Sequence, residues 1–119
     1  MTIQRFEELF AWQAARRLVK AVCATSRNRD VPWDVALRDQ IRRAALSIMA
    51  NIAEGFHRRS DREFVQFLFI AKASLAEVQS HLYAAVDQGY LNDSEFRHLF
   101  DQTEKIAKQV SGFISYLNK

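Results

Sequence analysis

Residues Leu37–Ser74, LRDQIRRAALSIMANIAEGFHRRSDREFVQFLFIAKAS, decide the fold of this chain. On a helical wheel at about 100° per residue, the first half of the stretch presents two apolar faces. The face expected in the core contains Leu37, Ile41, Ala44, Ile48 and Ile52. The opposite face contains Leu46, Met49, Ala50 and Ala53. A helix at the edge of a monomeric bundle needs only one apolar face, so the second face predicts an oligomer interface.

The middle of the stretch predicts where this helix ends and the next begins. We expect the helix to end near Gly55, which can adopt a left-handed terminal conformation without a side-chain penalty. Ser60 and Glu63 have the spacing of a capping box, in which Ser60 caps the next helix and Glu63 reaches back. Basic residues crowd the joint between the two helices: His57, Arg58, Arg59 and Arg62.

Hydrophobic periodicity predicts four helices, at about residues 5–26, 35–55, 61–88 and 93–117. Because short connections favour antiparallel neighbours, we expect an all-α, up-down-up-down four-helix bundle that forms a single domain of residues 1–119. The first helix is expected to bury Leu9, Trp12, Ala15, Val19, Val22 and Cys23. The third has a second apolar stripe of Val65, Phe69, Ala76 and Tyr83, and Phe69 joins the expected oligomer interface.

The composition is that of a globular protein. Of 119 residues, 49% are hydrophobic and 26% charged, and the single proline favours long helices over many short strands. The one cysteine, Cys23, excludes an intramolecular disulfide. The sequence has no signal-peptide pattern and no run of about 20 apolar residues. We therefore expect a cytoplasmic protein without a membrane partner.

Charge is distributed unevenly along the chain. Residues 1–62 contain 12 basic and 7 acidic residues, a net charge of +5, whereas residues 63–119 contain 5 and 7, a net charge of −2. This asymmetry predicts a basic surface, and RNA or DNA is a partner that fits it. The expected nucleic-acid contacts are arginines, whose planar fork suits phosphate oxygens: Arg38, Arg42, Arg43, Arg58, Arg59 and Arg62. Arg16, Arg17 and Lys20 would extend this surface; the competing interpretation is that all these charges only hydrate it.

A polar line follows one flank of the helix expected at 35–55. With the glycine that follows, it forms a structural motif of Gln40, Ser47, Asn51, Glu54 and Gly55, and Arg43 lies on the same flank. A polar line beside a core predicts a hydrogen-bonded seam, so Asn51 and Glu54 are expected to be structural rather than catalytic.

The sequence contains no convincing arrangement of catalytic or metal-binding residues. Two Glu-x-x-His pairs, Glu54/His57 and Glu95/His98, have the spacing used in dimetal carboxylate bundles. In the expected bundle, however, they would lie at opposite ends, about 30 Å apart. We therefore predict neither catalytic residues nor a metal or other cofactor.

The same stretch resembles a known family, the S23 ribosomal proteins or 23S rRNA intervening-sequence proteins. The similarity rests on Gln40-x-x-Arg43-Ala44-Ala45-x-Ser47-Ile48-x-x-Asn51-Ile52-Ala53-Glu54-Gly55. It continues through Arg59-Ser60, Glu63-Phe64, Phe67-Leu68, Ile70-Ala71, Ser74, Glu77 and Gly89-Tyr90-Leu91, and Leu9 and Trp12 fit the family's opening. Ala73 and His57 depart from the family's usual residues at those positions.

The resemblance implies a barrel-shaped homopentamer of four-helix bundles with a basic surface and no catalysis. Reading frames of the family lie in insertions within bacterial large-subunit rRNA genes. A related group serves as the accessory protein of diversity-generating retroelements, where it binds nucleic acid and the reverse transcriptase. Two hypotheses follow: an oligomeric bundle associated with RNA or another nucleic acid, or a scaffold that binds itself and a protein partner.

Overall fold

The structure, a computed structural model, describes residues 2–119. A 3₁₀ turn, η1 (Phe6–Glu8), precedes four helices: α1 (Phe10–Thr25), α2 (Val35–Phe56), α3 (Asp61–Asp87) and α4 (Asp93–Leu117). The part of the chain that the structure describes contains no strand. The all-α, four-helix prediction is therefore confirmed.

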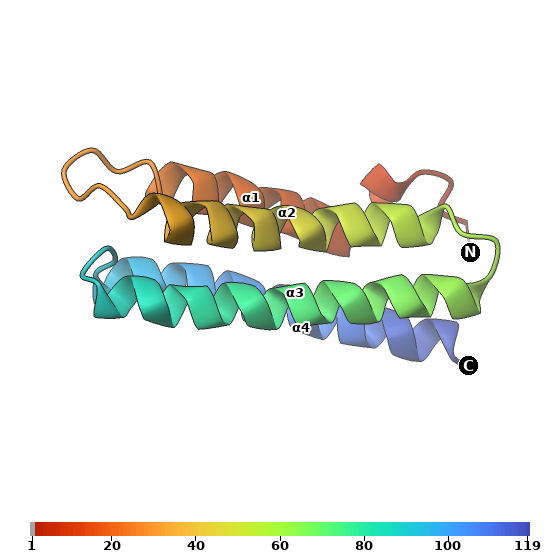
Figure 1. Cartoon of the computed structure of the whole chain (residues 1–119). Coiled ribbons are helices and arrows are strands. Elements are labelled where there is room, and N and C mark those ends of the chain that lie inside the picture. Colours follow the sequence, from red (N-terminus) through yellow and green to blue (C-terminus); the bar gives the residue numbers. More distant parts are fainter. Residues whose placement is uncertain (1) are drawn as a thin grey trace.

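The helices lie side by side in an elongated bundle of 46 × 19 × 19 Å. Both α1 and α3 pack against α2 and α4, and in the view of Figure 1 α1 and α2 form one layer and α3 and α4 the other. Figure 1 shows the chain reversing direction at each connection. As a result, both termini and the α2–α3 connection lie at one end of the bundle, and the other two connections lie at the opposite end.

Aliphatic side chains from all four helices fill the core. The largest fully buried ones include Leu18, Ile41, Ile48, Ile52, Leu68, Leu75, Leu82, Leu99 and Ile106. The predicted core row of α2 is buried except for Leu37, which is half-buried. In α1 the buried row is Ala11, Ala15, Leu18 and Val22. Trp12, Val19 and Cys23 are half-buried instead, because the face of α1 that points to the bundle axis is rotated relative to the one we predicted.

The first predicted helix is interrupted at Leu9, which corrects its expected start near Arg5. Leu9 has extended backbone angles (φ −73°, ψ 124°) and a fully buried side chain. Before it, the Glu8 carboxylate accepts hydrogen bonds from the backbone N–H groups of Gln4 and Arg5. These bonds close η1 as a separate turn, since the Glu8 side chain takes the place of the missing helical acceptors.

The remaining helix boundaries follow local caps. Asp34 caps α2, Ser60 caps α3, and Asn92 forms a capping box with Glu95 at the start of α4. Gly89, with φ +75°, occupies the left-handed position after α3. At Ser60 the prediction was right about the cap but wrong about its return contact, because Glu63 accepts from the backbone N–H of Arg59.

The α2 helix ends within one residue of Gly55, as predicted, but Gly55 does not adopt the left-handed conformation considered for it, and its role lies in helix packing. The helix continues to Phe56, and Gly55 is buried. A Cβ atom at this position would lie 2.8 Å from Phe64 Cδ1 and 2.8 Å from Phe67 Cβ. The absence of a side chain therefore lets α2 approach the first turns of α3 closely.

Candidate nucleic-acid interface

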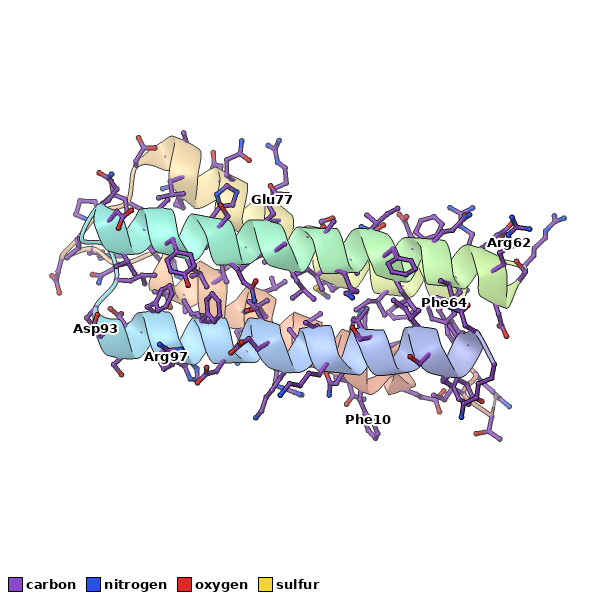
Figure 2. All side chains as sticks on the ribbon, turned by 90° about the horizontal axis from the view of Figure 1, so that it is seen from below. Phe10, Arg62, Phe64, Glu77, Asp93 and Arg97 are labelled. Atoms are coloured by element: carbon purple, nitrogen blue, oxygen red, sulfur yellow. The ribbon has the colours of Figure 1, made fainter. Side chains whose placement is uncertain are left out.

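The joint between α2 and α3 exposes three of the predicted arginines at one end of the bundle. Arg58, Arg59 and Arg62 are all exposed, and Figure 2 shows Arg62 at the start of α3, at one end of the bundle. The Arg58 guanidinium lies over the Phe67 ring, 4.5 Å from its centroid. No carboxylate of residues 2–119 is within salt-bridge distance of these three side chains. Glu54, Asp61 and Glu63 are nevertheless nearby in sequence, so the formal charge of residues 54–63 is balanced.

The other three arginines lie near the start of α2, and one of them has an intramolecular role. Arg42 donates from Nε to Ser26 Oγ at 2.8 Å and from a terminal nitrogen to the Cys23 carbonyl oxygen at 3.4 Å. A guanidinium at this place satisfies one carbonyl group in the last turn of α1 and complements the helix dipole. Arg38 Nε lies 3.5 Å from Asp39 Oδ1, whereas Arg43 is exposed.

The six predicted arginines therefore do not form one continuous patch. Arg38 and Arg58 are separated by about 30 Å along α2, at 1.5 Å per residue. What the fold does bring together is the basic half of the chain: α1 and α2 lie in one layer, and α3 and α4 in the other (Figure 1). The charge asymmetry along the sequence thus becomes an asymmetry between two layers of the bundle.

The predicted oligomer interface lies mostly on the outward surface of α2. Leu46 is 51% exposed and Ala50 is exposed, while Met49 and Ala53 are half-buried. Phe69 is 52% exposed but lies on another side of the molecule. Phe69 precedes Tyr83 by about four helical turns, so the two residues lie on nearly the same face of α3. That face borders α4, because the Tyr83 ring packs on Phe96 and Phe100. Four of the five residues are therefore grouped, and Phe69 is apart.

The predicted polar line contains a short hydrogen-bonded network at its centre. The Ser47 and Ser74 hydroxyls are 2.9 Å apart across the α2–α3 contact. The Asn51 amide donates to the Ser47 carbonyl oxygen at 2.8 Å and to Ser47 Oγ at 3.0 Å. Gln40 and Glu54, at the two ends of the line, are exposed. Ser47 thus links α2 to α3, and Asn51 supports Ser47 from within α2.

A basic hollow on α1 contains Trp12, predicted as a core residue, and Arg16, Arg17 and Lys20, predicted only to extend the basic surface. It has a volume of about 470 Å³ and is lined by Glu7, Trp12, Gln13, Arg16, Arg17 and Lys20. The Arg5 guanidinium contacts the Glu7 carboxylate at 2.7 Å, and this hydrogen bond holds the pKa of Glu7 below its ordinary value. The signal that could have revealed the hollow is the complete lack of acidic residues in α1.

The structure offers no cluster for metal chemistry in its described part. No group of three or more His, Cys, Asp or Glu residues among residues 2–119 could hold a metal ion. Glu54 lies at the end of α2 and Glu95 at the start of α4, at opposite ends of the bundle (Figure 1). None of the described helices combines the length and the apolar character needed to cross a membrane.

Comparison with known proteins identifies relatives of this bundle. Residues 7–112 match the sequence model of a family described as 23S rRNA-intervening sequence protein. The fold is similar to a crystal structure from Bacteroides thetaiotaomicron, described as a protein of unknown function from the S23 ribosomal protein family. The TM-score is 0.81 at 19% identity, over 88% of this chain and 95% of that one. No protein of curated function matches the sequence.

Proposed function

The chain belongs to the family of 23S rRNA-intervening sequence proteins, and from this premise we propose that it is a non-catalytic, homo-oligomeric bundle that associates with RNA. The observation that supports the proposal is the segregation of charge: residues 1–62, with a net charge of +5, include η1 and the basic α1–α2 layer. Arg43, Arg58, Arg59 and Arg62 expose guanidinium groups that lack a carboxylate partner within the described residues. Such groups bind phosphate oxygens by releasing counterions from the nucleic acid.

Self-association would strengthen this electrostatic contact. Leu46 and Ala50 are exposed on the outward surface of α2, and small alanines permit close approach of a second helix. Each subunit added to a ring would repeat the arginines of the joint. Once one subunit has bound, contacts made by its neighbours are effectively intramolecular, so a multivalent assembly binds a polyanion more tightly than one chain does.

A salt titration of RNA binding tests the proposal. The wild-type protein should bind a structured RNA with weak sequence preference, and its affinity should fall steeply as salt increases. Replacing Arg58, Arg59 and Arg62 by glutamine should weaken binding while helicity and assembly remain intact. A matched control replaces Lys72, Arg97 and Lys108 of the α3–α4 layer by glutamine, which removes the same charge from the other side. If the joint variant binds as well as the parent at equal salt, the joint only hydrates the surface, and the scaffold alternative is favoured.

One observation favours the alternative function of a protein-interaction scaffold. Phe10 is 76% exposed and projects from the bundle (Figure 2). It borders an apolar hollow of about 400 Å³ between the start of α1 and α4, lined also by Leu9 and Phe113. A bundle that binds no RNA at low salt but captures a protein through this hollow would fit the alternative and not the main proposal.

A further inference from the structure

Among the described helices, α1 is distinguished by having basic residues and no acidic one. It contains Arg16, Arg17 and Lys20, whereas each of α2, α3 and α4 contains at least two acidic residues. The three basic side chains are exposed and lie on the surface opposite the buried row of this helix. Their spacing of three and four residues places them next to one another along about one turn.

No carboxylate within the described residues neutralises the three cations that line the basic hollow. Glu7 is the only acidic residue in the lining, and its carboxylate is occupied by Arg5 at 2.7 Å. Within residues 2–119, no carboxylate lies within 4.0 Å of the charged nitrogens of Arg16, Arg17 or Lys20. The hollow therefore differs from the joint, where as many acidic as basic residues occur in a short segment.

Trp12 provides this hollow with an aromatic surface held in a fixed position. One side of the indole is half-buried against Phe6, whose ring meets it edge-on at 5.1 Å between centroids. The Arg16 guanidinium lies over the indole, 5.8 Å from its centroid, so a base that stacks on this face takes the place of the guanidinium. The Gln13 amide donates to the Glu7 carbonyl oxygen at 2.8 Å and so ties η1 to α1 beside the ring.

We propose that the basic hollow binds a segment of single-stranded nucleic acid. One base stacks on the Trp12 indole, and adjacent phosphates contact Arg16, Arg17 and Lys20. This inference rests on the proposed association with RNA and adds to it the site and the strand state of the ligand. Single-stranded binding sites in other proteins combine the same two elements, a cationic groove for the backbone and an aromatic ring for the base.

The combination of indole and cations favours this ligand over other polyanions. Cations alone would accept any polyanion, including a duplex or an acidic peptide, through charge. A stacking surface adds affinity only for a chain whose aromatic faces are accessible, and the bases of a duplex are already stacked on one another. The volume of about 470 Å³ is within the range of small-ligand sites and the hollow opens to solvent, so it suits one or two nucleotides of a longer strand.

Tryptophan fluorescence tests the proposal, because the chain has two tryptophans in different surroundings. Trp12 lies in the basic hollow, whereas Trp33 is 6% exposed and stacks on Tyr90 at the other end of the bundle. In a Trp33→Phe background, oligouridine should quench the fluorescence of Trp12. Inorganic polyphosphate should compete for the site without quenching, because it has charge but no base. A duplex of equal length and polyglutamate should bind more weakly than oligouridine.

Two variants separate the contributions of stacking and charge. Trp12→Leu should reduce the affinity for oligouridine by about 5- to 150-fold, the range measured for loss of one base–aromatic stack. Replacing Arg16, Arg17 and Lys20 by glutamine should flatten the log–log salt dependence by about 2, at about 0.7 per phosphate contact. The control variant of Lys72, Arg97 and Lys108 should change neither quantity, and circular dichroism should show unchanged helicity in all three.

The outcomes distinguish this inference from the proposed function. If oligouridine binds with unchanged affinity to Trp12→Leu and never quenches Trp12, the inference is wrong although RNA association stands. Equal affinity for polyglutamate and oligouridine would also overturn it, because the hollow would then recognise charge alone. If no RNA binds at low salt, the proposed function and this inference both fail.

Discussion

Replacing Gly55 by alanine should destabilise the bundle, although alanine is the better helix former. The added Cβ would lie 2.8 Å from Phe64 Cδ1 and from Phe67 Cβ, which is about 0.6 Å closer than ordinary van der Waals contact. The Phe67 atom is fixed to the backbone of α3 and cannot rotate away. Overpacking of this kind raises the free energy of the folded state by about 1–3 kcal/mol. The higher helix propensity of alanine offsets about 0.5–1 kcal/mol of this cost, so we expect a net loss of about 0.5–2 kcal/mol.

Gly112 provides a matched control in the same protein. It lies inside α4, is exposed, and would place an added Cβ in open space. Gly112→Ala should therefore stabilise the fold by about 0.5–1 kcal/mol, because only the helix-propensity effect operates. The assay is thermal unfolding followed by circular dichroism, in which 1 kcal/mol shifts the Tm by about 3–6 °C for a chain of this size. All variants need the same chain concentration, since self-association changes the apparent Tm.

The test is whether the two substitutions shift the Tm in opposite directions. The close approach of α2 and α3 requires opposite shifts, a lower Tm for Gly55→Ala and a higher one for Gly112→Ala. An equal rise in Tm for both variants would refute the reasoning, because Gly55 would then behave like any glycine in an exposed helix.

Three further predictions concern α2. Asn51→Ala should lower the free energy of unfolding by about 1–3 kcal/mol because the Ser47 hydroxyl and carbonyl oxygen lose the donor that Asn51 supplies, and an unchanged denaturant midpoint would count against the network. Arg42→Gln should lower the Tm slightly by weakening the contact with Ser26 and leave RNA affinity unaltered; a loss of affinity as large as that of the joint variant would show that Arg42 contacts the ligand. Ala50→Glu should break self-association by placing a charge in the proposed interface, and light scattering that finds the wild type monomeric at micromolar concentration would contradict the premise.

Helix boundaries were predictable from sequence wherever they depend on local bonds. Asp34, Ser60 and Asn92 each accept a backbone N–H within their own first turn, so the signal lies in a few adjacent residues. Gly89 likewise follows from a backbone position that only glycine occupies easily. The break at Leu9 was missed because a carboxylate cap at Glu8 competes with a continuous apolar pattern.

Residues whose role depends on a neighbouring helix were not predictable in the same way. Gly55 matches the pattern of a helix end, and only the position of α3 shows that it permits close packing. Arg42 matches the pattern of a phosphate contact, and only the position of α1 shows that its guanidinium also bonds to Ser26 and Cys23. Trp12 was predicted to lie in the core, but it lies beside the buried row of α1. Hydrophobic periodicity does not determine the rotation of a helix finely enough to separate the two positions.

The salt dependence of RNA binding by the intact protein tests the central claim most directly. If the α1–α2 layer binds the phosphate backbone, the affinity for a single-stranded RNA should fall steeply between about 50 and 200 mM salt, with a log–log slope of about −0.7 per phosphate contacted. The slope should be shallower for the variants that lack cations of this layer and unchanged for the control in the α3–α4 layer. Affinity that is undetectable at the lowest salt, or that does not change with salt, would contradict an RNA-associated role for this bundle.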